Sequence, residues 1–406
     1  MANKNKDIVI VGALRTPFGR TCGSLGDVDS LDLGAIPLRE ILKQINVPVK
    51  NIGEVFWSVN DSRTCERSFY MDPTRQSLIK AGLPHDTPSI SLGMSGTAAM
   101  QAVKLAAMTI KSGEIDCAIA GGATSFSSYN RLIEEIRHSS LDAEGTIIQV
   151  PAAPLYLHDF DSAAKYCDRV AFEYGIDRVE QDEWAYRSRT NYINAWNSGK
   201  FREEIFPLTL SKKDGEAFCL DIDEPHQPNL TPDALSKLNT IHGTRAITEG
   251  NAAAMADGAS AILLMTREKA IETGVQPLAT IVANISMSMD SSRIAETPGF
   301  AIQLVCKKAG LFTDDLDLVE INEDFACIPL VSLSTIAGDD NKKLRELEDK
   351  TNINGSSIAT GNPTTATAVR IIMNLMYELR RRGGGYAAGT LCNGLAQADA
   401  CVIKVE

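Results

Sequence analysis

The sequence lacks the features of a secreted, metal-binding, membrane or nucleic-acid-binding protein. Its nine cysteines form no Cys-X-X-Cys pair and no metal-type spacing, and their odd number argues against a complete disulfide framework. It has no apolar run long enough to cross a membrane, and its polar start predicts no signal peptide. The net charge of −12 argues against nucleic acid or an anionic membrane as the main partner. These absences predict a cytoplasmic protein with reduced thiols.

Apolar runs typical of strands alternate with amphipathic runs typical of helices. This alternation predicts an α/β fold with a mostly parallel sheet covered by helices. At 406 residues the chain is also expected to fold as two or three packed domains. The expected strands are 8–11, 55–59, 117–120, 279–285, 318–321 and 386–392. The expected helices are 30–44, 72–81, 97–112, 163–174, 179–198, 298–309, 325–336 and 365–382.

The middle of the chain differs from its flanks, because aromatic and charged residues are frequent there and Pro and Asp gather between 221 and 232. The two flanks repeat helix and strand in a similar order. We therefore predict a duplicated α/β unit with an insertion in its first copy. The N-terminal half takes 1–125 and 246–275, the inserted loop domain takes 126–245, and the C-terminal half takes 276–406.

A series of motifs in order along the chain resembles those of thiolases. They are the strand-turn at 11–19, the loop-to-helix turn at 91–102, the stretch at 112–122, the Gly-Asn-Ala segment at 248–259, the Asn-Glu-Asp-Phe segment within 320–326, the Gly-Asn-Pro at 361–363 and the Cys-Asn-Gly at 392–394. Asn362 and Cys392 keep the separation of the family's histidine and second cysteine. The resemblance covers essentially the full length.

The resemblance implies the thiolase fold, in which two βαβαβαββ halves form five α-β-α-β-α layers with an inserted loop domain. It also implies a homodimer or homotetramer, with a hetero-partner subunit as a further possibility. Coenzyme A or an acyl-CoA would be the substrate, with no permanently bound cofactor and no metal.

The chain departs from the family at two catalytic positions. Gly96 stands where thiolases have the nucleophilic cysteine, and Asn362 stands where they have histidine. The resemblance implies that the Gly96 and Gly394 N–H groups hold a tetrahedral oxyanion, that Asn322 positions a water at an enolate oxygen, and that Cys392 shuttles a proton. The Asn362 amide can donate a hydrogen bond as an imidazole does, but it cannot act as a base.

The expected coenzyme A contacts also differ from the family. Ala252 and Ala253 lie in the segment expected near the pantetheine arm, and Ala253 stands where a serine is usual. Gln227 aligns loosely with the arginine expected near the adenine. His158 lies in the insertion that lines the acyl pocket in the family, although a surface loop histidine explains it as well.

Three functions stay open at this stage. The first is an acyl-CoA enzyme that makes or breaks a C–C bond, by an aldolase-like step, acyl transfer or hydrolysis of a β-ketoacyl-CoA, without a covalent acyl-cysteine. The second is an inactive thiolase-like subunit or a CoA-binding regulator. The third is an acetyl-CoA C-acyltransferase with another nucleophile, such as Ser95, although N-capping of the 97–112 helix would explain Ser95.

Overall fold

The computed structural model describes residues 6–45, 47–60, 72–128, 160–211, 215–225, 230–241 and 243–406. The strands are β1 (Ile8–Arg15), β2 (Gly19–Arg20), β3 (Glu54–Asn60), β4 (Ser89–Ser91), β5 (Cys117–Thr124), β6 (Leu208–Ser211), β7 (Ala217–Leu220), β8 (Ala256–Thr266), β9 (Ala279–Ser288), β10 (Leu318–Ile321), β11 (Gly385–Cys392) and β12 (Gln397–Val405). The α-helices are α1 (Ser30–Gln44), α3 (Pro73–Ala81), α4 (Ala98–Ser112), α6 (Phe160–Glu173), α7 (Arg178–Asn197), α8 (Pro232–Ser236), α9 (Arg267–Thr273), α10 (Thr297–Ala309), α11 (Cys327–Ala337), α12 (Asn341–Lys350), α13 (Ser357–Thr360) and α14 (Thr364–Arg382).

The main sheet is continuous in the order β10-β11-β12-β9-β1-β8-β5-β3-β4, with β2 paired to β8. Only β3–β4, β3–β5 and β10–β11 pair in parallel, so the prediction of a mostly parallel sheet is wrong. The four residues between β11 and β12 allow only a hairpin return, which makes that pair antiparallel. A strand that is buried on both faces has the same continuous apolar sequence whether it pairs in parallel or antiparallel. The sequence pattern therefore could not reveal the strand directions.

The two halves of the sheet have the same internal order. In the first half β3 runs parallel to β5, and β8 runs antiparallel to β5 and β1. In the second half β10 runs parallel to β11, and β12 runs antiparallel to β11 and β9. The halves join where β1 pairs with β9. This repeat confirms the predicted duplication.

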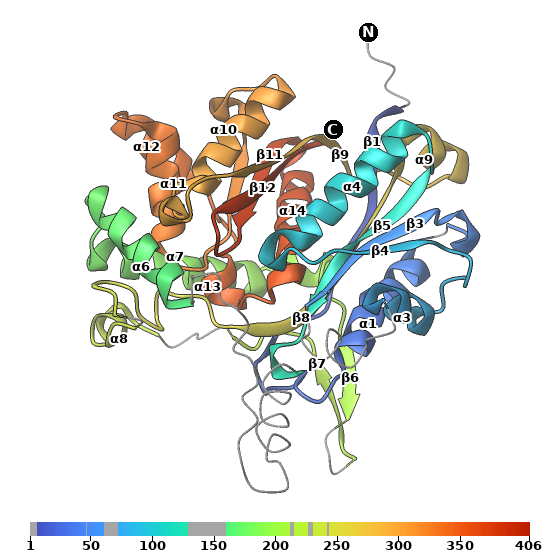
Figure 1. Cartoon of the computed structure of the whole chain (residues 1–406), viewed down its shortest axis with the longest axis horizontal. Coiled ribbons are helices and arrows are strands. Elements are labelled where there is room, and N and C mark those ends of the chain that lie inside the picture. Colours follow the sequence, from blue (N-terminus) through green and yellow to red (C-terminus); the bar gives the residue numbers. More distant parts are fainter. Residues whose placement is uncertain are drawn as a thin grey trace, which may run out of the picture.

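The helices make three layers around the two halves of the sheet (Figure 1). The helices α4 and α14 lie between the halves, and their apolar residues pack with residues from the strands of both. The helices α1 and α3 cover the outer face of the first half, while α10 and α11 cover the outer face of the second. The resulting α-β-α-β-α arrangement agrees with the predicted five layers.

Local sequence signals explain where the layer helices start and stop. The Asp29 carboxylate accepts from Leu31 N and caps α1, and Asp72 caps α3 in the same way. The α4 helix is rich in alanine and ends at Gly113, whose φ of +85° is left-handed. Small side chains on α4 let this helix lie close to both halves of the sheet. Among the described residues, no helix is long and apolar enough to cross a membrane.

Candidate active site

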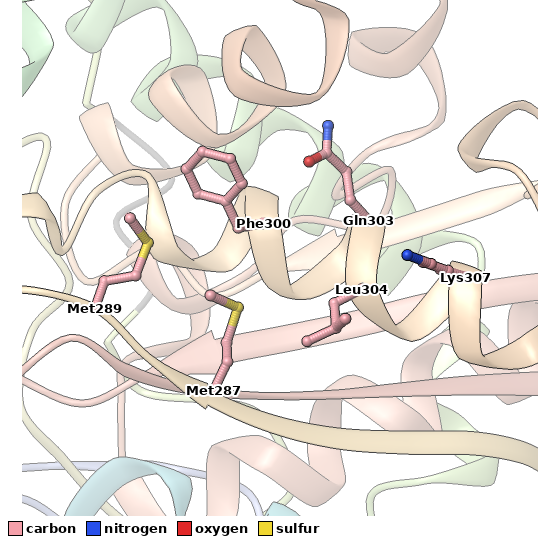
Figure 2. A pocket seen from close by; sticks show the side chains of 6 residues that line it. All are labelled: Met287, Met289, Phe300, Gln303, Leu304 and Lys307. Carbon is pink, nitrogen blue, oxygen red and sulfur yellow. The ribbon is translucent and has the colours of Figure 1, made fainter.

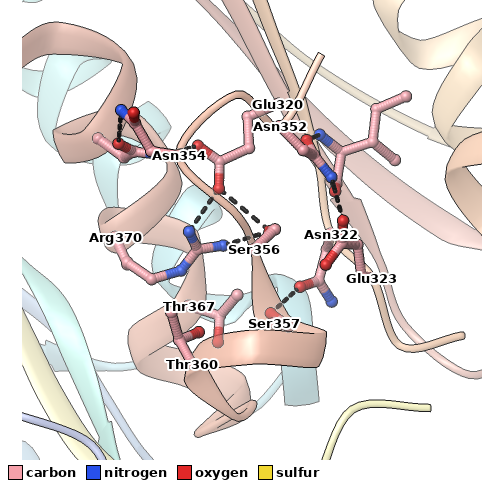
Figure 3. Close-up of polar contacts among 12 residues, drawn as sticks. Glu320, Asn322, Glu323, Asn352, Asn354, Ser356, Ser357, Thr360, Thr367 and Arg370 are labelled. Carbon is pink, nitrogen blue, oxygen red and sulfur yellow. Dashed lines mark hydrogen bonds and ion pairs between the residues drawn. The ribbon is translucent and has the colours of Figure 1, made fainter. Parts of the chain in front are cut away.

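The turn after β10 is anchored on one side by a buried carboxylate. Glu320, in β10, is 1% exposed and pairs with the Arg370 guanidinium of α14. Asn374 Nδ2 donates to its other oxygen at 2.7 Å, and Ser356 Oγ donates at 3.1 Å (Figure 3). A buried carboxylate that is bound by this many donors is held rigidly in one position. Glu320 therefore fixes the end of β10 against α14.

A second buried carboxylate anchors the same turn to the inserted segment. Glu323 accepts from Trp184 Nε1 at 2.9 Å and from Ser188 Oγ at 2.7 Å, both on α7. Asn352 Nδ2 donates to Glu323 at 2.8 Å and also to the Ile321 carbonyl at 2.8 Å. With Glu320 and Glu323 both held, the backbone that carries Asn322 and Asp324 is rigid. The site therefore stands on a preorganised turn.

Asp324 is the acceptor for the two asparagines of the site. Asn362 Nδ2 donates to Asp324 Oδ1 at 2.5 Å, and the Asn322 side chain also donates to this carboxylate. Each amide oxygen has its own donor, Thr367 Oγ1 at 2.7 Å for Asn362 and the Ser357 hydroxyl for Asn322. These donors orient both NH2 groups toward Asp324.

The Asp324 carboxyl group titrates close to neutrality. Burial raises its pKa to about 6, and the hydrogen bonds from Asn322 and Asn362 oppose that rise because they favour the charged form. The side chain is only partly buried, so solvent or a ligand can reach it. A carboxyl group in this state can both accept and donate a proton near pH 7.

Cys392 lies at the end of β11, next to the turn that follows β10. Its side chain is 5% exposed, and its Sγ–H donates to the Ile294 carbonyl at 3.7 Å. Burial, with a contribution from the Asp324 charge, holds the pKa of the Cys392 thiol well above its usual range. Cys392 is therefore a thiol and a potential proton donor at neutral pH, and not a thiolate nucleophile.

Gly96 lies beside Cys392. It sits in the 3-10 turn η3 (Ser95–Thr97) that leads into α4 and is itself buried. A Cβ atom at Gly96 would have one neighbour within 4 Å, the Cys392 carbonyl oxygen at 3.8 Å. The site therefore has room for a side chain at position 96. Gly394 lies two residues beyond Cys392, is exposed, and has open space at its α-carbon.

Ser95 does not cap α4, so that expectation is wrong. The N-cap of α4 is Thr97, without a side-chain cap hydrogen bond. Ser95 instead has a φ of +53°, a left-handed conformation that is uncommon for a residue with a Cβ. The 3-10 turn shifts the helix start beyond Ser95 and explains the difference.

The segment expected to bind the pantetheine arm lies against the same turn. Ala253 N donates to the Asp324 carbonyl at 3.0 Å, and Ala252 forms a β-bridge with Phe325. Both alanines are partly exposed. Further along this segment, Asn362 N donates to the Ala254 carbonyl at 2.9 Å. Backbone bonds thus hold the segment beside both asparagines of the site.

Two predicted positions cannot be placed. Gln227 and His158 both lie outside the described residues. Within the described ranges, no group of three or more His, Cys, Asp or Glu side chains could hold a metal ion.

The structure brings most of the predicted residues to one place. Asn322 and Asn362 both donate to the Asp324 carboxylate, and the Asp324 charge contributes to the raised pKa of Cys392. Cys392 in turn lies next to Gly96. Asp324 is a site residue that the sequence motifs did not predict. The available signal was its place in the Asn-Glu-Asp-Phe segment, where the family motif has alanine.

Comparisons with known proteins identify the family. Residues 8–268 match the thiolase N-terminal domain, and residues 275–405 match the thiolase C-terminal domain. This chain belongs to the thiolase family. It is 31% identical over 404 residues to an acetyl-CoA acetyltransferase of Syntrophomonas wolfei, with 98% of this chain and 99% of that protein covered. It is 29% identical to a beta-ketoadipyl-CoA thiolase of Acinetobacter baylyi, with 98% and 99% covered.

Solved structures agree with this assignment and confirm the predicted thiolase fold. The human mitochondrial 3-ketoacyl-CoA thiolase superposes with a TM-score of 0.87 at 28% identity, covering 99% of this chain and 100% of that one. A structure of human mitochondrial 3-ketoacyl-CoA thiolase in complex with CoA superposes with a TM-score of 0.85 at 27% identity, covering 99% of both chains.

Proposed function

We propose that this thiolase-family protein acts on an acyl-CoA and makes or breaks a C–C bond next to the thioester, without forming an acyl-cysteine at position 96. Full-length relatives named as an acetyl-CoA acetyltransferase and a beta-ketoadipyl-CoA thiolase support an acyl-CoA substrate. The thiolase structure in complex with CoA supports coenzyme A as the carrier. Aldolase-like cleavage or addition, an acyltransferase-like reaction with an acceptor other than free CoA, and hydrolysis of a β-ketoacyl-CoA all fit this proposal.

One observation carries the proposal. Gly96 has no side chain, and the described residues leave open the space beside the Cys392 carbonyl. An acyl-enzyme needs a nucleophilic atom here, and glycine supplies none. The open space could instead hold a water molecule or a substituent of the substrate. Catalysis would then proceed directly on the bound thioester.

The remaining groups have distinct roles in this proposal. The Gly96 and Gly394 N–H groups would stabilise an oxyanion on the thioester or ketone carbonyl. The Cys392 thiol, protonated at neutral pH, would donate a proton to the carbon released from the broken bond. Ala252 and Ala253 would contact the pantetheine arm.

Two measurements test the proposal. Thiolysis of acetoacetyl-CoA by free CoA should be at least ~10³-fold slower than with an active thiolase, because no covalent intermediate forms. Mass spectrometry of the protein quenched during turnover should show no acyl adduct. An adduct on this polypeptide, or thiolysis at the rate of an active thiolase, would refute the proposal.

The double variant Gly96→Cys with Asn362→His tests whether positions 96 and 362 are the nucleophile and histidine positions of the family. If the catalytic positions are assigned correctly, this variant should gain acyl-adduct formation with acetyl-CoA. Gly96→Ser with Asn362→His is the matched control, because it fills the same space with a far weaker nucleophile.

A non-catalytic subunit or CoA-binding regulator is the second candidate. An exposed apolar groove between β9 and α10 favours it, because such patches on a surface often bind partners (Figure 2). Phe300 and Leu304 are 37% and 42% exposed there, next to Met287, Met289 and Lys307. Co-purification of a stoichiometric protein partner, with no turnover of any acyl-CoA by either form, would favour this function.

A third candidate is an acyltransferase with another nucleophile. Ser95 adjoins the Gly96 position, and its left-handed backbone distinguishes it from an ordinary helix-start serine. Acyl transfer that is lost in Ser95→Ala would support this candidate.

We also propose that the chain forms a homodimer or homotetramer. The edge strand β4 supports this, since Ile90 in β4 is 39% exposed and the edge has no partner strand within the described part of the chain. Sedimentation of the purified protein would give the assembly state.

A further inference from the structure

The Asp324 carboxylate accepts hydrogen bonds from the same two amide groups that a bound enolate oxygen would need as donors. Asn362 Nδ2 lies 2.5 Å from Asp324 Oδ1, and Asn322 donates to the same carboxylate. An enolate oxygen bound at these two amides would lie within a few ångströms of Asp324. Two negative charges so close in a partly buried site repel strongly. Asp324 must therefore be neutral whenever an enolate is present.

Proton transfer from the substrate to Asp324 would satisfy this requirement in a single step. We propose that Asp324 is the catalytic base of this site: it removes a proton from the α-carbon of the bound acyl-CoA, and the reverse of this step returns it. This inference rests on the proposed acyl-CoA substrate.

The proposed step is balanced in atoms and charge. The α-C–H bond breaks, its electron pair moves into the enolate with the charge on the thioester oxygen, and the proton forms an O–H bond on Asp324. The negative charge thus moves from one oxygen to another within reach of the same two NH2 groups. The amides that favour the Asp324 carboxylate become free to donate to the enolate. Asn322 and Asn362 are positioning and charge-stabilising groups in this step.

The neighbours of Asp324 suit a base that works near neutral pH. The titratable groups that interact with it in the described part of the chain are the thiols of Cys392 on β11 and Cys167 on α6. Burial raises the pKa of both thiols. The Asp324 charge adds to the rise for Cys392, whereas for Cys167 the neighbouring Cys327 and Cys392 thiols add more than Asp324 does. The neighbouring Glu323 carboxylate faces α7 and is bound there. Asp324 itself titrates close to neutrality, with a pKa of about 6.

Deuterium exchange at the α-carbon tests the proposal without knowledge of the full reaction. The protein is incubated in D2O with acetyl-CoA, propionyl-CoA or acetoacetyl-CoA, and label in the acyl group is followed by mass spectrometry against the protein-free rate. The wild type should exchange at least one of these thioesters, with a rate that rises with pH and levels off above an apparent pKa of about 6.

Two variants at Asp324 separate its chemistry from its contacts. Asp324→Ala introduces the residue of the family motif, so folding should be kept, and Asp324→Asn keeps the size of the side chain. Each should lower exchange by ~10²-fold or more and remove the pH inflection, because a positioned base contributes about that factor. The binding affinity for acyl-CoA should change less than about threefold. Asp340→Asn is the control, because an asparagine also caps α12 and its rate should equal that of the wild type.

The outcomes distinguish this inference from the proposed function. Exchange at the wild-type rate in both Asp324 variants would overturn the inference and leave the acyl-CoA function standing. Loss of exchange in Cys392→Ala, with full exchange in Asp324→Asn, would assign the base to Cys392 instead. Absence of binding to all three thioesters would overturn the proposed function, and the inference with it.

Discussion

Replacing Asp324 by asparagine should stabilise the folded protein at neutral pH, with a gain that shrinks as the pH falls. The reason is the cost of holding a carboxylate in a partly buried site. Burial raises the pKa of Asp324 in the folded state, so the folded protein binds this proton more tightly than the unfolded chain does. Asparagine carries no charge at any pH and avoids the cost.

The size and sign of the effect follow from the two pKa values. The pKa is 3.8 for an ordinary aspartate and about 6 for folded Asp324. At about 1.4 kcal/mol per pKa unit, the difference corresponds to roughly 3 kcal/mol. Protonation stabilises the wild type fully below pH 3.8, and this stabilisation is lost as the pH rises through about 6. The variant should therefore be more stable by up to ~3 kcal/mol at pH 8, and the gap should narrow by ~1.4 kcal/mol at pH 5.

Urea unfolding of the wild type and Asp324→Asn at pH 5, 6, 7 and 8 measures this gap directly. Asp340→Asn serves again as the control, because it makes the same chemical change at a helix cap that asparagine also suits. A gap for Asp324→Asn that is constant from pH 5 to pH 8 would refute the reasoning, because it would mean that Asp324 does not titrate in this interval. A variant less stable than the wild type at pH 8 would show that the lost hydrogen bonds outweigh the charge.

The remaining predictions concern packing and buried charge. Gly96→Ala should change the melting temperature by less than ~2 °C, because the new methyl group meets only one carbonyl oxygen at van der Waals distance. Gly361→Ala should destabilise the protein by on the order of 1–3 kcal/mol and abolish activity, since Gly361 has a φ of +81° and a Cβ there would lie 2.5 Å from Pro225 Cγ. Asp223→Ala should cost about 3–5 kcal/mol in urea unfolding, because the fully buried Arg15 guanidinium loses its bidentate partner at 2.7 and 2.9 Å.

The sequence predicted the elements well where periodicity and end signals agreed. The helix expected over 30–44 is α1 with the same bounds, and the strand expected over 318–321 is β10. The strand expected over 117–120 continues through two glycines to Thr124 as β5. The directions of the strands could not be predicted from the sequence, because they depend on where the chain re-enters the sheet. The β8 strand shows this, since it returns after the whole insertion and runs antiparallel to both of its neighbours.

The sequence motifs predicted most residues of the candidate site, but not the contacts between them. The resemblance to thiolase motifs indicated Asn322, Asn362 and Cys392, and their mutual contacts through Asp324 needed the structure. Nothing in the residue types indicates that both asparagine oxygens are bound by hydroxyl groups, which is what aims both NH2 groups at one acceptor. The raised pKa of Asp324 likewise follows from burial, and burial is a property of the folded chain.

The substitutions at this site make most sense together. Where the family resemblance predicts a histidine, this chain has Asn362, and the Asn362 amide donates to Asp324 Oδ1. The site therefore holds a titratable proton acceptor, Asp324, next to this position. A subunit without catalysis would gain nothing from a carboxylate whose burial costs up to about 3 kcal/mol, and alanine would fit the motif at that position. Under the proposed acyl-CoA function, a destabilising, titratable group beside a protonated thiol and two aligned amides favours proton transfer at carbon over a role without catalysis.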